Sequence, residues 1–566
     1  MSPMTRFILF ALTLFSLGLK AQYEETIISV GDRTLTVDQA FKIAELPKVI
    51  DTIPKAYELD YSPLHRQVSV NYEPKPIKAA KLKVQEPLGR LYRGYAKAGI
   101  GLYITPLAEL RFNSIRNRDW AYGIHARHFS SQGGLDDVGE NAYSQNDLSA
   151  WARRYIDKHT IEAGFHYDRD VVHYYGFDPG DSGIADDDYR QRFNVLSGYA
   201  EYASHYRDSA KVQHTIRLDY RSLGDTYNTK ENRFLIDADL AKTVEDYRFA
   251  LSTSLDLNGL TAQEPGIISG QEPFTTDSSF VNELEYDNSL FKVEPHIHAR
   301  KGDLTADVGL GIVVEGGDPE SSIRVYPRAY LSYSLFDNLF TPYAGLTGDL
   351  QRTSYHDLSR VNPFMYHVPD LLNTSKDLEL YAGIRGTILD NLSFNAKFSV
   401  ADFDDRPFFI TDTLTTAFDN RFLVIYDDLR EISLSGELTY IHDKNSRVTA
   451  RLELIDYSNE NQAEAWNLPG WRFSTDARYD LNDQFVAKLQ IFAEGQRKAL
   501  GRDSDGEYGT QELRGFVDGS IGLEYRYTKR ISAFLDINNL TGGRYPRWLG
   551  YPVQSILVLG GLTYSF

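Results

Sequence analysis

Apolar and polar residues alternate along much of this chain, and the pattern is clearest in its final residues. Side chains of a β-strand point alternately to the two faces of the strand, so a period of two predicts a strand. The final segment is therefore expected to be a strand with one apolar face. Counting in twos, that face holds Ile556, Val558, Gly560, Leu562, Tyr564 and Phe566.

The same period recurs in residues 432–440, 448–454 and 517–527, where apolar residues on one face oppose Ser, Thr, Glu, Asp or Arg on the other. One face could meet lipid and the other a hydrated lumen. From about residue 90 onward we count about 22 strand-like segments. Helical periodicity is almost missing, with residues 37–45 as a short exception.

The connections between these segments alternate in length. Every second connection is tight and rich in Asn, Asp or Gly, which are turn residues: 116–119, 157–158, 207–210, 301–303, 337–338, 390–391, 482–483 and 528–530. The connections between them are mostly long: 133–145, 176–191, 261–287, 355–377, 405–429, 457–469 and 497–514.

This alternation predicts an all-β, antiparallel transmembrane barrel, with its tight turns in the periplasm and its long loops outside the cell. A strand with an apolar face that ends on an aromatic residue is also typical of the closing strand of such barrels. The alternative for that strand alone is an edge strand of a soluble sheet.

Composition does not oppose this interpretation. A mean hydropathy of -0.39 and a net charge of -19 look soluble, but a membrane barrel is apolar only at every second residue. The 38 Tyr and 30 Phe residues suit aromatic girdles. After the N-terminal segment the chain contains no run of about 20 apolar residues, so the sequence predicts no transmembrane helix. The absence of Cys excludes disulfides and thiolate chemistry, and the acidic charge argues against a nucleic-acid partner.

Two segments precede the predicted barrel. Residues 1–21 resemble a secretory signal peptide, with Arg6 before the apolar stretch 7–17 and Gln22 as the expected mature start. The alternative, a membrane anchor, would need a longer apolar stretch. Residues 22–89 contain six prolines between Pro47 and Pro87, and we expect a periplasmic or lumen-entering segment rather than a compact domain.

One stretch resembles a known family. Residues 535–545, which read LDINNLTGGRY, are similar to the segment on the penultimate strand of TonB-dependent receptors, and residues 550–552 and 560–566 continue the likeness. The resemblance covers roughly residues 90–566. It implies a barrel of about 22 strands in the outer membrane of a Gram-negative bacterium, in which Leu562, Tyr564 and Phe566 face lipid and act as an assembly signal.

The resemblance weakens at the front of the chain. TonB-dependent receptors fill their barrel with a plug of well over a hundred residues, whereas residues 22–89 amount to 68. The short segment Glu25, Thr26, Ile27, Ile28, Ser29 and Val30 resembles a TonB box, which would pair with TonB. An ordinary strand-like start is the alternative. A barrel this wide would be a large pore if empty, so the N-terminal segment, inward-folded loops or partner proteins should close it.

Three groups of polar residues are candidate metal ligands. Each has a simpler interpretation as lumen wall, membrane interface or solvated loop, which we favour, so we predict no metal site and no cofactor. The first group shares one strand face and consists of Glu294, His296, His298 and Arg300. The second is a set of scattered histidines: His125, His128, His159, His166 and His173. The third is an acidic loop with Asp178, Asp181 and Asp186 to Asp188.

No catalytic motif is recognisable in the sequence, so we predict that the protein is not an enzyme. The missing plug favours a barrel that serves as a scaffold or component of an envelope complex. The alternative is a TonB-dependent transporter with a reduced plug, taking up a nutrient or a metal chelate. The expected partners are outer-membrane lipid, other envelope proteins or lipoproteins, and, for the transporter, TonB.

Overall fold

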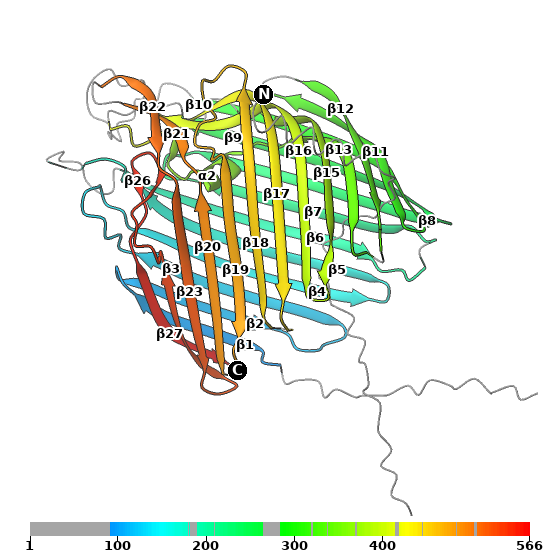
Figure 1. Cartoon of the computed structure of the whole chain (residues 1–566), viewed down its shortest axis with the longest axis horizontal. Helices are drawn as coiled ribbons and strands as arrows, with labels where there is room; N and C mark the ends of the chain where they lie inside the picture. Colours follow the sequence, from blue (N-terminus) through cyan, green and yellow to red (C-terminus); the bar gives the residue numbers. More distant parts are fainter. Residues whose placement is uncertain are drawn as a thin grey trace, which may run out of the picture. The chain divides into compact units, whose positions relative to one another are not determined.

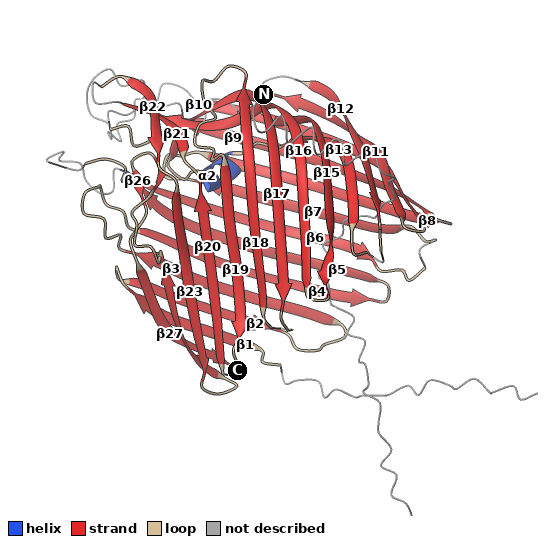
Figure 2. Cartoon of the chain, in the orientation of Figure 1, coloured by secondary structure: helices blue, strands red, loops and turns tan. Residues whose placement is uncertain are grey.

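The computed structural model of the chain is built almost entirely of β-strands (Figure 2). Residues 1–90, which hold the predicted signal peptide, the TonB-box-like segment and the helical periodicity at 37–45, lie outside the residues that the structure describes. The described residues are 91–178, 180, 189–208, 210–263, 283–318, 321–336, 338–367, 371–413, 418–443, 445–482, 484–502 and 506–566.

Within this described part, 22 antiparallel strands form a closed barrel, as expected from the alternating pattern. They are β1 (Gly94–Gly101), β2 (Thr105–Asn113), β3 (Trp120–Ser131), β4 (Tyr143–Ile156), β5 (His159–His173), β6 (Arg190–Ser204), β7 (Gln213–Gly224), β8 (Lys230–Val244), β9 (Tyr247–Gln263), β10 (Glu283–Lys301), β11 (Leu304–Gly317), β12 (Ser322–Tyr333), β13 (Thr341–Gln351), β15 (Thr374–Leu389), β16 (Leu392–Thr411), β17 (Phe422–Ile441), β18 (Arg447–Asn459), β19 (Trp471–Asp480), β20 (Phe485–Glu494), β23 (Phe516–Arg526), β24 (Ile531–Asn538) and β27 (Leu557–Ser565).

Each barrel strand pairs with the next along the chain, and β27 pairs with β1 to close the ring (Figure 1). At this seam Gly94 and Phe566 exchange two backbone hydrogen bonds, each 2.9 Å long. Closure leaves no unpaired strand edge, which is the condition for a sheet to cross a bilayer.

The two faces of the barrel have opposite character, as the sequence predicts. On β23 the apolar side chains Val517, Leu523 and Tyr525 are exposed on the outside. Charged residues line the lumen and pair across strands; Lys97 lies 3.2 Å from Asp536, for example. An apolar exterior around a polar interior is typical of outer-membrane barrels. Among the described residues, no helix is long and apolar enough to span a membrane.

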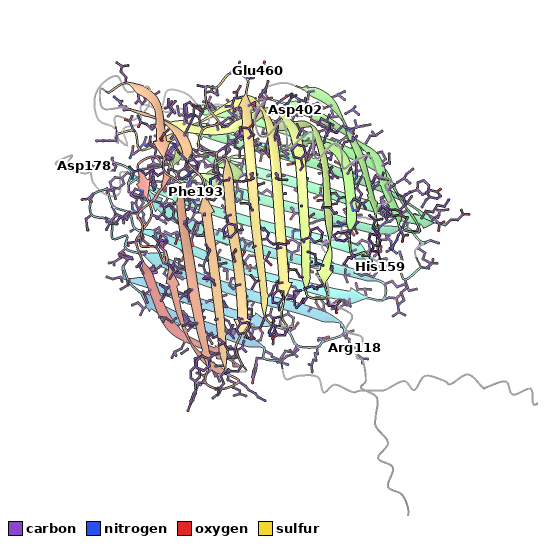
Figure 3. The ribbon with its side chains drawn as sticks, in the orientation of Figure 1. Arg118, His159, Asp178, Phe193, Asp402 and Glu460 are labelled. Carbon is purple, nitrogen blue, oxygen red and sulfur yellow. The ribbon has the colours of Figure 1, made fainter. Side chains whose placement is uncertain are left out.

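Most long connections lie at one end of the ring and tight turns at the other, as predicted, although the loop-end connections 102–104 and 225–229 are also short. The tight turns 157–158, 302–303 and 390–391 join β4 to β5, β10 to β11 and β15 to β16 at one end. His159 and Arg118 lie toward this end, and Asp178 and Glu460 toward the loop end (Figure 3).

The long connections differ from the expectation in several places. The predicted loop 405–429 is shorter, because β16 continues to Thr411 and β17 begins at Phe422. These extensions bury Phe408, Phe409 and Phe422, so they are stabilised as sheet beyond the predicted strand ends. Most of the connection from β9 to β10, residues 264–282, lies outside the described residues.

Three long connections contain secondary structure of their own. The β13–β15 connection holds the helix α2 (Tyr355–Val361) and β14 (Met365–His367), where only a loop was expected. The β20–β23 connection forms a hairpin of β21 (Arg497–Arg502) and β22 (Tyr508–Leu513). The β24–β27 connection, which the sequence did not indicate as a long loop, holds β25 (Pro546–Trp548) and β26 (Tyr551–Pro552).

Candidate ligand-binding site

Helix α2 lies inside the loop end of the barrel because the wall caps its N-terminus. The Ser354 hydroxyl accepts a hydrogen bond from the backbone N–H of Asp357 at 3.1 Å, which satisfies one of the free donors of the first turn. The buried carboxylate of Glu231, on β8, accepts two more N–H groups, from Tyr355 at 2.8 Å and from His356 at 3.0 Å. A lumen-facing side chain thus completes the cap of a loop helix.

An apolar core joins α2 to the barrel walls on both sides. Wall strands β6, β7 and β9 contribute to one side of this core and β16 and β17 to the other, so the loops extend across the lumen. We call this group the mouth core. It consists of Phe193, Val195, Leu223, Leu260, Tyr355, Leu358, Met365, Leu371, Phe409, Phe422, Val424, Trp548 and Tyr551.

The β24–β27 connection supplies the last part of the mouth core. The Asn539 side chain, at the end of β24, donates to the carbonyl oxygen of Gln554 at 2.7 Å. Tyr545 donates its hydroxyl to Asp518 at 2.7 Å and stacks on Phe516 with ring centroids 3.9 Å apart. Asn539 and Tyr545 belong to the stretch that carries the family resemblance, and their contacts direct this loop into the lumen.

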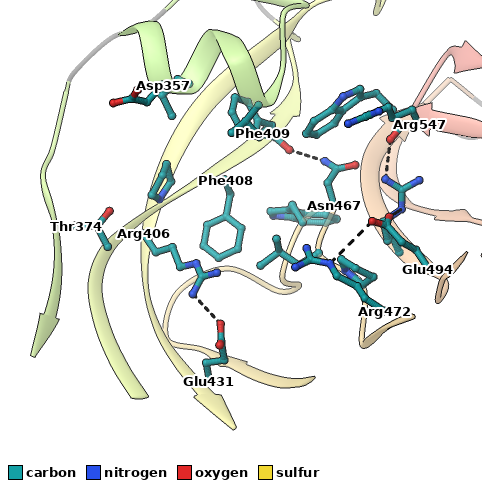
Figure 4. Close-up of a pocket in the computed structure, with 18 of the residues that line it drawn as sticks. Asp357, Thr374, Arg406, Phe408, Phe409, Glu431, Asn467, Arg472, Glu494 and Arg547 are labelled. Atoms are coloured by element: carbon teal, nitrogen blue, oxygen red, sulfur yellow. Dashed lines mark hydrogen bonds and ion pairs between the residues drawn. The ribbon is translucent and has the colours of Figure 1, made fainter. Parts of the chain in front are cut away.

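A cavity of about 700 Å3 lies beside α2, between the mouth core and the wall from β16 to β23 (Figure 4). This volume is in the range of small-molecule sites. Eight aromatic side chains line it: Phe403, Phe408, Phe409, Trp466, Phe492, Phe516, Tyr545 and Trp548. Five arginines also line it, against three carboxylates: Arg352, Arg406, Arg472, Arg497 and Arg547, and Asp357, Glu431 and Glu494.

The arginines of the cavity differ in how firmly they are paired. Arg406 forms a close ion pair with Glu431 at 2.8 Å. Arg472 is held more loosely, 3.9 Å from both Glu453 and Glu494. Arg497 also lies 3.9 Å from Glu494 and donates to two backbone carbonyl oxygens at 2.7 Å. The arginines that line the cavity outnumber its carboxylates, although Arg352 is paired with Asp256 outside the lining at 3.2 Å. Arg472 can turn toward an anion without breaking a short ion pair.

Burial changes the acidity of two groups at this wall. Burial lowers the pKa of Arg497, although Glu494 opposes the shift. Burial, together with the hydrogen bond to Asp518, raises the pKa of the Tyr545 hydroxyl. Tyr545 therefore remains a neutral donor, and the cavity offers cations and aromatic faces to a ligand.

Solved structures resemble this barrel closely, although no protein-family profile and no curated protein sequence matches the chain. The ferripyoverdine receptor of the outer membrane of Pseudomonas aeruginosa superposes with a TM-score of 0.63 at 12% identity, over 84% of this chain and 72% of that one. The FrpB iron transporter from Neisseria meningitidis gives 0.64 at 10%, over 85% and 82%. The copper transporter OprC gives 0.61 at 14%, over 84% and 82%.

The chain has the barrel fold of the TonB-dependent receptors. This fold and the apolar exterior of the barrel are those of an outer-membrane protein, so the expected location is confirmed at the level of the fold. Residues 22–89, expected to form a segment shorter than the usual plug, remain outside the described part.

The receptor-type barrel exposes its proposed assembly signal. Leu562 and Tyr564 lie on the outer face of β27 beside the seam, and Phe566 directly follows the strand; 62%, 43% and 43% of their surfaces are exposed. Their orientation toward the exterior is as predicted, and their role in assembly stays a prediction.

The structure separates most of the candidate metal ligands. Residues 294, 296, 298 and 300 share the lumen face of β10, as expected, but the His298 ring lies 3.7 Å from Asp307 on the neighbouring strand β11. Asp178 accepts the Gly180 N–H at 3.0 Å, and the other aspartates of its loop lie outside the described residues.

The five other histidines also lie at different places. His125 and His166 face the lumen, where His125 lies 3.1 Å from Glu109. His159 stacks on Tyr202 on the outer face, with centroids 5.2 Å apart. His128 and His173 form hydrogen bonds of 2.7 Å near the loop end, with Asn146 and with the carbonyl oxygen of Ala142.

Sequence reasoning missed the cavity residues. Arg406, Arg472 and Arg497 lie on separate elements, and only the closed ring brings them together. One local signal was present: Ser354 followed three residues later by Asp357 fits an N-terminal helix cap and could have indicated α2.

Proposed function

We propose that this protein is an outer-membrane receptor of the TonB-dependent type that binds a small anionic ligand with aromatic groups and takes it up. The observation that carries this proposal is the cavity at the loop end, with five arginines, three carboxylates and eight aromatic side chains around about 700 Å3. Guanidinium groups bind carboxylate, sulfonate or phosphate groups, and aromatic side chains stack on planar groups.

The solved proteins with this fold support uptake rather than catalysis. The structures reported above are named as a ferripyoverdine receptor, an iron transporter and a copper transporter. The ligands in these names are those of the solved proteins. For this chain we propose only the class of activity, which is uptake across the outer membrane. In this proposal residues 22–89 act as a reduced plug, and residues 25–30 pair with a strand of TonB.

Binding can be tested with a rigid aromatic polyanion, pyrene tetrasulfonate, by fluorescence anisotropy on the full-length protein in nanodiscs. Arg472→Ala removes the loosely paired cation of the cavity. We expect it to weaken binding by about tenfold or more, since one charge-assisted contact contributes about 1.5–3 kcal/mol.

The matched control for this measurement is Arg451→Ala. Arg451 is a lumen-facing arginine of β18 that pairs with Glu437 at 2.7 Å and does not line the cavity. Binding that is unmeasurable in the wild type, or equally weakened by both variants, would remove the cavity as the ligand site.

Uptake can be tested separately with Ile27→Pro. Proline removes a backbone donor, so a TonB-pairing segment would lose one hydrogen bond of its added strand. We expect normal levels of folded barrel and normal probe binding, but loss of crosslinking to TonB. Unchanged crosslinking would exclude residues 25–30 as the TonB contact.

The second candidate function, which the sequence favours, is that of a scaffold in an envelope complex. The mouth core supports it, because Tyr355 and Tyr551 are fully buried in the loops and a permanently closed barrel needs such packing. Mild detergent extraction should then recover stoichiometric envelope proteins or lipoproteins, and deletion of residues 31–89 should release them. Ile27→Pro should leave that complex intact, which separates the two candidates.

A further inference from the structure

Three potential metal ligands meet on the lumen wall, away from the cavity. Asp147 on β4 and Asp168 on β5 are directly opposite each other in the strand register. His166 lies two residues before Asp168, on the same lumen-facing side of β5. One ligand atom from each of these three side chains lies within 4.8 Å of the other two, and the His166 Nε2 atom is 2.8 Å from an Asp168 oxygen.

The pairing of two ionised aspartates across neighbouring strands is unfavourable unless a cation or a proton neutralises one of them. Like charges directly opposite each other in a sheet repel, and the strand register prevents the two backbones from moving apart. Arg127 lies 3.4 Å from Asp147, whereas Asp168 has as its ion-pair neighbour among the described residues only the His166 imidazole, which is a cation only when protonated. Only 13% of the Asp168 side chain is exposed to solvent, which limits the relief that water can give.

Two other lumen carboxylates of this barrel are each held by two cations. Asp256 is held by Arg233 at 2.7 Å and by Arg352 at 3.2 Å. Glu379 is similarly held by two lysines at 2.6 and 2.7 Å. In both cases two cations surround one carboxylate. At Asp147 and Asp168 one arginine faces two carboxylates, an arrangement that Arg217 also shows with Glu201 and Asp219. The distinguishing group beside Asp147 and Asp168 is the imidazole of His166, which is a common metal ligand.

We propose that Asp147, His166 and Asp168 form a binding site for a divalent first-row transition-metal ion such as Zn2+. One imidazole nitrogen and two carboxylate oxygens are a ligand set that suits Zn2+, with water in the remaining position. The imidazole argues against Mg2+ and Ca2+, which prefer oxygen ligands. The ion would neutralise the opposed carboxylates, and His166 would exchange its contact with Asp168 for the metal.

The position of the site gives the bound ion a structural context. Asp170 continues the same face of β5 toward the loop end, where it interacts electrostatically with Arg360 of α2. The metal site therefore lies in the wall just below the docked helix. The inference does not depend on the proposed uptake function, since the residues and the ligand differ from those of the cavity.

The test uses tag-free, full-length protein in detergent, stripped with a chelator and titrated with ZnCl2 by calorimetry. We expect one Zn2+ per chain, and Asp168→Asn and His166→Ala should each weaken binding by about tenfold or more, in line with the loss of one ligand. X-ray absorption of the Zn2+-loaded wild type should show nitrogen and oxygen ligands.

His125→Ala is the matched control. His125 is also a lumen histidine and lies 3.1 Å from Glu109, but it is not part of this cluster. It should leave Zn2+ binding unchanged. The absence of saturable binding, or equal losses in His125→Ala and His166→Ala, would overturn the site. The heat-modifiable gel shift checks that each variant is folded, and Asp168→Asn, which preserves side-chain shape, provides the test if His166→Ala does not fold.

Discussion

The N-terminus of α2 shows how a few residues hold a loop inside the barrel. Ser354 caps the helix, Glu231 accepts two of its N–H groups, and Asp357 lies in the first turn, where the helix dipole favours a negative charge. The Ser354 hydroxyl donates to an Asp357 oxygen at 2.5 Å, and Arg221 lies 3.7 Å away. The docking of the helix should therefore depend on the ionisation of Asp357.

We predict that the docking of α2 weakens in acid. Burial would raise the pKa of Asp357, but hydrogen bonds from His356 and Ser354 and the charge of Arg221 lower it to about 2, from an ordinary value of 3.8. A lowered pKa in the folded state contributes stability above the unfolded value and loses it as the pH falls. Protection of residues 355–361 from hydrogen exchange, corrected for intrinsic rates, should fall between about pH 4 and pH 2.

Asp357→Asn is the control for this pH dependence. The amide cannot ionise, so protection of the helix should be lower at neutral pH and nearly constant down to about pH 2. A pH dependence that is identical in both proteins would assign it to another group.

At the scale of elements, the long connections define one end of the barrel and the tight turns the other. We predict that the loop end faces the outside of the cell. An epitope inserted after Gly270, in the connection from β9 to β10, should be labelled on intact cells. The same epitope after Gly302, in the turn from β10 to β11, should be labelled only once the outer membrane is broken. The reverse result would invert the topology.

Helix α2 should help to close the barrel. Leu358, on its buried face, is 5% exposed, and a charge there is costly, so Leu358→Asp should release the helix from the mouth core. We expect single-channel conductance of the purified protein to rise several-fold. Val361→Asp, on the face that is 57% exposed, should change little. Equal conductance in both variants and the wild type would show that these loops do not limit passage.

The sequence predicts some of these elements and not others for physical reasons. A strand that faces lipid on one side and water on the other has an alternating sequence, so segments such as 517–527 can be recognised alone. Seven residues of helix are too few for a periodic signal, and α2 is stable because Glu231 and the mouth core hold it. The contact between His298 and Asp307 depends on the register between β10 and β11. The alternation of apolar and polar residues within one strand does not specify that register.

The seam between β1 and β27 determines whether the whole barrel can close. The ring of Phe566 lies over Gly94, and a Cβ atom at that position would come within 2.1 Å of it. Gly94→Ala should therefore displace the Phe566 ring from the seam, at a cost of up to about 1–3 kcal/mol typical of overpacking. Deletion of Phe566 removes the ring and its two backbone hydrogen bonds to Gly94. Both changes should reduce the heat-modifiable, folded fraction in membranes.

Ile323→Ala provides the comparison for the seam variants. Ile323 is an apolar residue that is 74% exposed on β12, away from the seam. Its truncation should leave the folded fraction near that of the wild type. A loss as large as that of Gly94→Ala would mean that apolar surface, rather than seam closure, controls the yield.

The seam also imposes an order of events on biogenesis. β1 is the first strand of the ring to be synthesised and β27 the last, yet each is the other's neighbour. Until β27 is available, β1 presents an unpaired edge, and every partial sheet is a template for aggregation. Insertion strand by strand during export would leave that edge in lipid, where unmet hydrogen bonds are costly. The chain therefore needs a chaperone that keeps it unfolded in the periplasm, and a catalyst that shields the first strand until the last arrives.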